Sequence, residues 1–219
     1  MGFLEIKTAA EQGDAEAQFR LGECYYLGDG VEKNCDDALK WYGKAAEQGN
    51  ARAQCVLGVC YAKGELVNKD YAEAVKWFHK AAMQGHTDAQ YNLGTSYRKG
   101  EGVPLDNVKA YAWYNLAAKS KEAAVQARNL LEATMFPQQV TEGIYHTREL
   151  HIIIGAHRLR ETGEADNKRQ RRLPLTVLSQ SSNTPKTSSI PVSISRMRSR
   201  RLPRAVRPRG WRHATHFIS

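Results

Sequence analysis

Apolar side chains recur along the first two thirds of the chain at the spacing of a helix rather than of a strand. In the first such segment they fall at i, i+4, i+7 and i+8, on one face of a helix. These positions are Ala17, Leu21, Cys24 and Tyr25. A second stripe follows, formed by Ala38, Trp41, Tyr42, Ala45 and Ala46. Because the small side chains allow a close approach, the pattern predicts two packed helices.

This helix pair is repeated along the chain. An offset of 36 residues aligns the same residue types three times: Ala17, Ala53 and Ala89; Leu21, Leu57 and Leu93; Gly22, Gly58 and Gly94; Tyr25, Tyr61 and Tyr97; Ala38, Ala74 and Ala110; Trp41, Trp77 and Trp113. Self-similarity at a fixed period of this size indicates a solenoid, in which each unit buries its apolar face against its neighbours. We therefore predict an all-α fold, a right-handed α/α solenoid.

Glycine and short polar residues mark the helix ends. The glycines that follow the first helices are Gly28, Gly64 and Gly100. A left-handed residue is needed there, and glycine has no Cβ to oppose it. The residues that precede the second helices are Asn34, Asp70 and Asp106, whose short side chains accept from free amides. Asp70 with Glu73 also resembles a capping box. We interpret the recurrent glycines as helix caps and not as a phosphate-binding loop.

The segment from Asp14 to Val31 resembles the Sel-one-like repeat (SLR), a relative of the tetratricopeptide repeat. The residues that extend the resemblance are Ala38, Trp41, Ala45, Ala46 and Gly49. It implies three repeats within residues 14–120. Ala9, Ala10 and Gly13 stand one period before Ala45, Ala46 and Gly49, so residues 1–13 resemble the second helix of a half-repeat.

The resemblance continues past the third repeat. Residues 111–118 are similar to the last repeat of many bacterial members, and residues 123–143 to the helix, Met-x-Pro turn and helix that close the stack. It thus implies capping helices in residues 121–150. Leu66 departs from the pattern, standing where the other repeats have Gly30 and Gly102. Phe136 also departs, because the family usually has a capping Thr there.

The charge changes sharply near the same point. Residues 1–143 hold 16 Lys and Arg against 19 Asp and Glu, whereas residues 144–219 hold 16 against 4. The segment 151–219 is rich in Arg, Ser and Pro, and we expect it to be disordered because it has too little apolar surface to bury. Weak, non-specific nucleic-acid binding, adhesion to an anionic membrane surface and an extension without selected function all remain open for it.

Several functional classes are disfavoured. No segment approaches the roughly 20 apolar residues of a membrane span. The start lacks a signal peptide, so we expect a cytoplasmic protein, or a periplasmic or secreted one if the true start lies upstream. The four cysteines lack CxxC spacing and are expected to be free thiols. His213 and His216 have no companion ligand nearby, and we expect neither a metal nor a cofactor.

One serine, Ser96, matches a short catalytic motif. Some members of the repeat family have been linked to β-lactam binding or hydrolysis, and Ser96 with Lys99 matches the SxxK motif. However, Ser96 occupies the repeat position of Cys24 and Cys60, and no SDN or KTG companion exists. GxSxG, HExxH and the phosphate-binding GxxxxGK[ST] are also absent. We expect no enzyme, and a β-lactam-interacting protein is the weakest alternative.

The candidate binding surface is the concave face formed by the first helices. Analogy with tetratricopeptide repeats selects the second, fifth, ninth, twelfth and thirteenth positions of each first helix. From these we predict partner contacts at Phe19, Glu23, Tyr26, Arg52, Lys63, Tyr91, Arg98 and Lys99. Aromatic residues and arginine are common binding hot spots. Phe19 and Tyr91 have an alternative role, packing between adjacent units. Tyr26 and Arg98 are the clearer candidates.

Taken together, these features predict a non-catalytic adaptor that binds a protein or peptide on its concave face. We expect it to be a monomer. Nucleic-acid association through the basic segment is the alternative.

Overall fold

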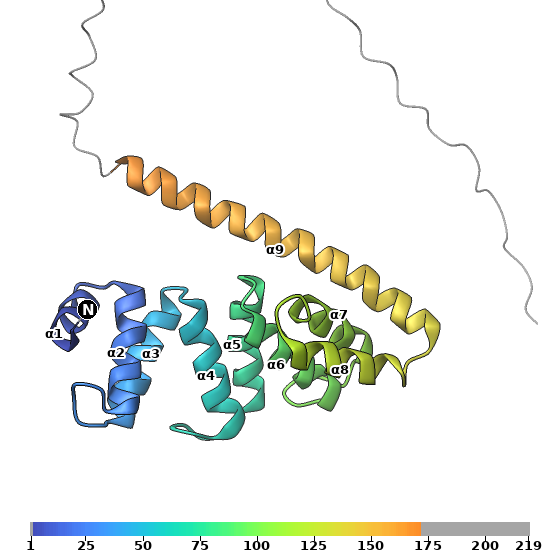
Figure 1. The fold of residues 1–219 in the computed structure, drawn as a ribbon, viewed down its shortest axis with the longest axis horizontal. Helices are drawn as coiled ribbons and strands as arrows, with labels where there is room; N and C mark the ends of the chain where they lie inside the picture. The colour runs from blue at the N-terminus through green and yellow to red at the C-terminus, as the bar shows by residue number, and fades with distance from the viewer. Residues whose placement is uncertain (1, 172–219) are drawn as a thin grey trace, which may run out of the picture. The chain divides into compact units, whose positions relative to one another are not determined.

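The computed structural model describes residues 2–171, and their side chains as far as residue 160. Every regular element in this range is a helix (Figure 1). The helices are α1 (Phe3–Glu11), α2 (Ala15–Leu27), α3 (Cys35–Glu47), α4 (Ala51–Lys63), α5 (Tyr71–Met83), α6 (Thr87–Lys99), α7 (Asn107–Ala117), α8 (Glu122–Glu132) and α9 (Pro137–Arg171). From α1 to α8, each helix packs against the next one along the chain. The predicted all-α solenoid is confirmed.

Small residues bring the two helices of each pair together. The alanines that recur at one position of the second helices, Ala38, Ala74 and Ala110, have an exposed fraction of 1% or less. Each pair then closes around one large ring, which is Tyr42 in the first, Phe78 in the second and Tyr114 in the third. The core is therefore a row of similar clusters, as expected for a solenoid.

The predicted caps are confirmed at both helix ends. Gly28, Gly64 and Gly100 adopt left-handed backbones at the ends of the first helices, with φ of 79°, 75° and 71°. Asn34, Asp70 and Asp106 accept backbone amides at the starts of the second helices. The reciprocal half of the Asp70–Glu73 capping box is not formed. The Asp70 amide donates to the Tyr61 carbonyl at 3.0 Å, while Glu73 pairs with Lys76.

We expect replacement of Asp70 with alanine to destabilise the protein by about 1 kcal/mol. Its carboxylate accepts from the Glu73 amide at 3.0 Å, and alanine leaves that amide without its acceptor. Urea unfolding followed by circular dichroism measures the change. Asp70→Ser keeps an acceptor and should retain most of the stability. Equal losses in both variants would mean that the cap contributes nothing.

A second set of recurrent glycines lies inside helices rather than at their ends. Gly22, Gly58 and Gly94 lie within α2, α4 and α6. A Cβ at Gly58 would stand 2.5 Å from the Phe78 ring, and one at Gly22 would stand 2.7 Å from the ring of Tyr42. These positions must lack a side chain because a partner-helix ring occupies the space.

Leu66 adopts a backbone conformation that glycine has in the other repeats. Its φ is 69°, against 71° at Gly30 and 76° at Gly102. A side chain in this left-handed region is sterically unfavourable. Leu66 is the one residue other than glycine with positive φ in the described range.

The closing helices differ from the expectation in their length. Helices α8 and α9 lie in the expected region, but α9 continues past residue 150 to Arg171. Ile154 is buried against the core of the second and third repeats, and the Arg158 side chain donates to the Gln84 carbonyl at 3.2 Å. Residues 151–171, expected to be disordered, are therefore helical. The rest of the basic segment, 172–219, lies outside the described residues.

The departure at Phe136 is compensated locally. The Gln139 side chain accepts from the Phe136 amide at 3.0 Å, so this free donor at the start of α9 is satisfied without a threonine. Gly143 then allows α9 to pack directly against the Tyr111 ring.

Candidate functional site

A hollow of ≈ 390 Å³ lies between α2 and α4. It is lined by Glu23, Tyr26, Leu27, Tyr42, Cys55, Val56, Val59, Cys60, Lys63, Glu65 and Leu66. Glu23, Tyr26 and Lys63 are predicted partner contacts, and Leu27, Cys55 and Val59 occupy positions selected for the same face. The repeat register thus brings two neighbouring first helices to one concavity, which from here on is called the α2–α4 hollow.

The floor of the α2–α4 hollow is apolar. Tyr42 and Cys60 are buried, and Val56 and Val59 are half-buried beside them. Burial raises the pKa of the Cys55 thiol to about 12 and also raises that of Cys60. Both thiols are therefore neutral at physiological pH and weak nucleophiles. All four cysteines are free, and the two in the hollow act as small apolar residues.

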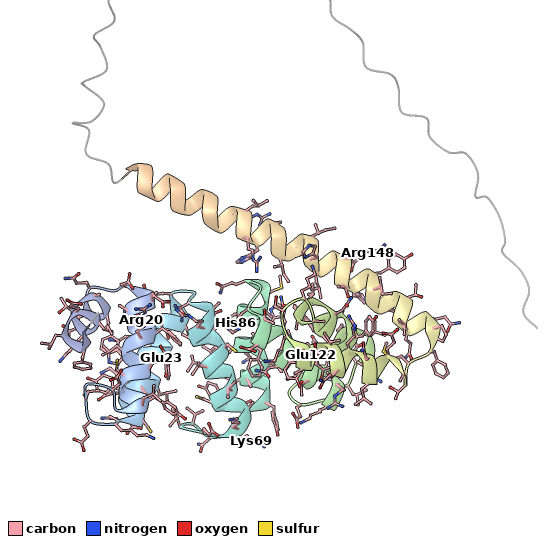
Figure 2. All side chains as sticks on the ribbon, viewed as in Figure 1. Arg20, Glu23, Lys69, His86, Glu122 and Arg148 are labelled. Carbon is pink, nitrogen blue, oxygen red and sulfur yellow. The ribbon has the colours of Figure 1, made fainter. Side chains whose placement is uncertain are left out.

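Glu23 is the charged group set deepest in this hollow. Its side chain is half-buried, and burial raises its pKa, against the opposing effect of the Arg52 charge. Within residues 2–160, no hydrogen bond or ion pair reaches its carboxylate. Figure 2 marks Glu23 and Arg20 on α2.

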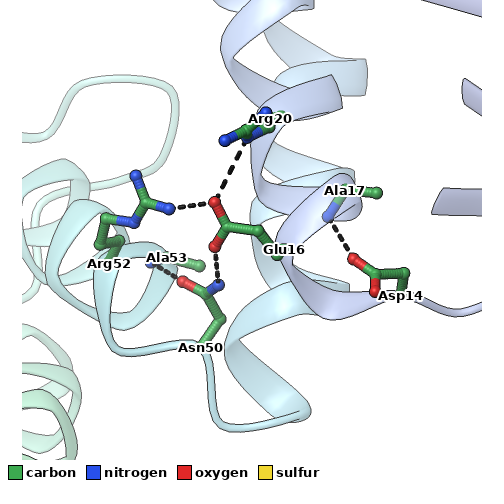
Figure 3. Close-up of polar contacts among 7 residues, drawn as sticks. All are labelled: Asp14, Glu16, Ala17, Arg20, Asn50, Arg52 and Ala53. Atoms are coloured by element: carbon green, nitrogen blue, oxygen red, sulfur yellow. Dashed lines mark hydrogen bonds and ion pairs between the residues drawn. The ribbon is translucent and has the colours of Figure 1, made fainter. Parts of the chain in front are cut away.

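Arg20 and Arg52, whose charges act on Glu23, both bind another carboxylate, that of Glu16 (Figure 3). Arg20 and Arg52 both reach Glu16 Oε1, and Asn50 donates to Oε2 at 3.1 Å. Burial acts to raise the Glu16 pKa, but the hydrogen bonds from Arg52 and Asn50 outweigh it and lower the pKa. This Glu16 cluster joins the first turns of α2 and α4.

The rim of the hollow carries further charges and one aromatic ring. Lys63 Nζ lies 3.4 Å from Glu65 Oε1, so these two rim charges compensate each other. Tyr26 is 39% exposed, and the Lys33 ammonium lies 5.4 Å from its ring centroid. Tyr26 therefore presents an accessible aromatic surface beside the hollow.

The other predicted contacts lie elsewhere. Phe19 is 4% exposed and its ring packs 5.7 Å from that of Tyr42, which favours the packing alternative. Arg52 is exposed but engaged with Glu16, and it also covers the Phe19 ring. Tyr91 is half-buried against Tyr114, at 5.6 Å between centroids.

Arg98 and Lys99 are exposed on α6, outside the lining of the α2–α4 hollow. Lys99 Nζ lies 3.7 Å from a Glu101 carboxylate oxygen. The lining of the α2–α4 hollow therefore includes no residue of the third repeat.

Sequence reasoning missed a chain of buried glutamines. Gln18, Gln54 and Gln90 each donate to a carbonyl of the preceding helix, at Ala10, Ala46 and Ala82. Gln48 donates to Gln18 at 2.6 Å, and Gln84 donates to Gln54 at 2.8 Å. The 36-residue offset contains this signal, since the three buried glutamines align. They fix each repeat to the one before it.

Ser96 does not have the setting of a nucleophile. Its side chain is buried, and its hydroxyl donates to the Asn92 carbonyl at 3.2 Å. Lys99, the lysine of the SxxK match, is instead near Glu101. This favours a packing role at the position that cysteine occupies in the other repeats.

The described part of the chain has neither a membrane-spanning helix nor a cluster of metal-ligating side chains. Between residues 2 and 171, no helix combines the length and the apolar character that a membrane crossing requires. Among the side chains described, those of residues 2–160, no group of three or more His, Cys, Asp or Glu is arranged to hold a metal ion. His213 and His216 lie outside it.

Comparison with known proteins agrees with the architecture. The Sel1 repeat family model matches residues 15–50, 51–86 and 87–121, which correspond to the pairs α2–α3, α4–α5 and α6–α7. A Sel1 repeat protein from Oxalobacter formigenes, known from its crystal structure, is 44% identical with a TM-score of 0.56. That match covers 57% of this chain and 96% of the other.

Two further relatives are longer. The crystal structure of c5321, a protective antigen present in uropathogenic Escherichia coli strains, displays an SLR fold and is 36% identical with a TM-score of 0.59. The match covers 72% of this chain and 33% of that one. The sel1-like repeat-containing protein L18 of Acanthamoeba polyphaga mimivirus is 45% identical over 40 residues, 18% of this chain and 7% of the viral protein. With three matched repeats and a 44% identical relative covered almost throughout, the chain belongs to the Sel1-like repeat family.

Proposed function

We propose that this protein is a non-catalytic adaptor that binds a peptide segment of a partner protein in the α2–α4 hollow. The observation that carries the proposal is the hollow itself, with a volume of ≈ 390 Å³, an apolar floor and a few charged groups at its wall and rim. Binding sites commonly combine an apolar concavity with a small number of placed polar groups. Repeats of this family typically form protein-interaction scaffolds, which supports the same function.

Hydrogen bonds between the helices around the hollow support a preformed binding surface. The Glu16 cluster links α2 to α4 at one end, and Gln54 links α4 to the end of α3. A preformed surface loses less conformational entropy when a partner binds. Aromatic side chains such as Tyr26, accessible at the rim, often contribute much of the binding energy.

Retention of proteins from a nuclease-treated lysate by the full chain tests this function. We expect a discrete protein to be retained, and Tyr26→Ala to reduce its retention at least fivefold because the rim loses its aromatic surface. Tyr145→Ala is the matched control, since Tyr145 is 60% exposed on α9 and does not line the hollow. Mass spectrometry identifies and quantifies the retained protein.

The outcomes separate the alternatives. Retention unchanged by Tyr26→Ala would place binding outside the hollow and overturn the site. Retention that appears only without nuclease would favour the alternative function, nucleic-acid association through the basic segment, for which the 16 Lys and Arg of residues 144–219 are the supporting observation. No retained protein in either lysate would contradict the adaptor function.

A further inference from the structure

We infer that the α2–α4 hollow recognises a basic side chain, lysine or arginine, of the partner peptide, with its cation on the Glu23 carboxylate and its aliphatic stem against the apolar floor. The inference rests on the proposed function and adds the chemistry of its ligand. It is carried by three features of the hollow: a half-buried carboxylate without a hydrogen-bond or ion-pair partner among residues 2–160, an apolar floor and an unusual backbone at Leu66.

The charge of the hollow is the first feature. Lys63 and Glu65 neutralise each other at the rim, at 3.4 Å. Arg20 and Arg52 are bound to Glu16, and their charges act on Glu23 only through space, without a direct contact. Glu23 is thus left as a half-buried carboxylate that no hydrogen bond or ion pair satisfies within residues 2–160. A partly desolvated charge of this kind is unfavourable alone, and a ligand cation would compensate it.

The apolar floor is the second feature. Tyr42, Val56, Val59 and Cys60 line the hollow beside Glu23. Lysine and arginine bury their methylene stems on apolar surfaces while the charged end binds a polar partner. A short cationic group would leave this floor uncovered, and a purely apolar side chain would leave Glu23 uncompensated. A long basic side chain covers the apolar floor with its methylene stem and pairs its charge with Glu23.

Leu66 is the third feature. At this repeat position Gly30 and Gly102 take the left-handed backbone without a side chain, whereas Leu66 takes it at φ 69° and lines the hollow. Non-glycine residues held in such backbones often occur at ligand-binding sites. Leu66 therefore supplies an apolar wall for the stem. Leu66→Gly should fold normally, because two repeats of the same protein have glycine at this position.

Four small probes with one alkyl chain and different head groups test the inference. We would titrate the full chain with n-hexylammonium, n-hexylguanidinium, hexanol and hexanoate, and follow backbone amide resonances by nuclear magnetic resonance. We expect saturable shifts at residues of the hollow, at least fivefold tighter for the two cations than for hexanol, and weakest for hexanoate.

Variants assign these effects to particular residues. Glu23→Gln should abolish the preference for cations and leave hexanol binding unchanged. Leu66→Gly should weaken the binding of all four probes about threefold and keep the preference for cations. Glu47→Gln is the matched control, since Glu47 is exposed on α3 and does not line the hollow, and the preference for cations should persist in it.

Three results would overturn the inference: equal affinity for hexylammonium and hexanoate, a preference that survives in Glu23→Gln, or shifts that map outside the hollow. Each is distinguishable from failure of the proposed function. A partner protein retained by the full chain and lost by Tyr26→Ala would leave the adaptor function intact even if the probes showed no preference for cations.

Discussion

Replacement of Gly58 with alanine is expected to destabilise the protein by about 3 kcal/mol. Gly58 lies in the middle of α4, and a Cβ there would stand 2.5 Å and 2.6 Å from two atoms of the Phe78 ring. The ring cannot move aside easily, because Phe78 is 4% exposed within the core. The two helices must therefore separate, which reduces the packing of the whole second repeat.

Gly43→Ala is the control for this prediction. Gly43 also lies within a helix, α3, but a Cβ there meets nothing within 4 Å. Alanine should stabilise the protein by about 0.5–1 kcal/mol, because glycine loses more backbone entropy in a helix. Urea unfolding measures both changes. If the two variants shifted the midpoint in the same direction, close packing at Gly58 would not be the reason for its recurrence.

Replacement of Gln54 with alanine should have a comparable effect, also about 3 kcal/mol. Gln54 is 4% exposed, and its amide nitrogen donates to the Ala46 carbonyl at 3.0 Å while its oxygen accepts from Gln84 at 2.8 Å. Alanine removes both bonds, so the Ala46 carbonyl keeps only backbone donors such as the Gly49 amide at 3.1 Å, and the Gln84 side chain loses its acceptor. It also leaves a cavity where three helices meet.

The control is Gln12→Ala. Gln12 is exposed just after α1, and its replacement should change the free energy of unfolding by less than about 0.5 kcal/mol. Hydrogen exchange of the amides in α4 and α5 adds a local measurement, because loss of Gln54 should speed exchange there more than in α7. An equal increase of the exchange rate in all helices would argue against a local link between repeats at Gln54.

The helix ends could be predicted from the sequence because their causes are local. A left-handed residue after a helix favours glycine, and free amides at a helix start favour Asn or Asp. Gly64 and Asp106 satisfy these requirements within a few residues of their own position. Helical periodicity and the 36-residue offset also place Glu23 and Lys63 on one face, and both line the α2–α4 hollow.

The end of the helical region could not be predicted in this way. Composition changes and the family resemblance stops near residue 150, yet α9 continues. Tertiary contacts stabilise this extension of α9. Ile154 packs against the core of earlier repeats, and the Arg158 side chain donates a hydrogen bond to the Gln84 carbonyl. Neither contact leaves a periodic signal in the basic segment.

The same distinction applies to the candidate site. Phe19 and Tyr26 were both predicted as aromatic contacts, but their helical positions do not show that the Phe19 ring is enclosed by Tyr42 while Tyr26 remains accessible. Likewise, Arg52 is a predicted contact whose charge is engaged by Glu16. Which side chains remain available to a partner depends on neighbours distant in sequence.

By itself, the sequence determined the repeat, the helix pairs, their caps and the face on which a partner is expected, because each depends on periodicity or on interactions within a few residues. Only the tertiary structure decided why Gly58 recurs, what Gln54 joins and that Glu23, in an apolar hollow, has no hydrogen-bond or ion-pair partner among residues 2–160. These properties arise where helices from different parts of the chain meet, and there burial and unsatisfied charge depend on distances that no linear pattern contains.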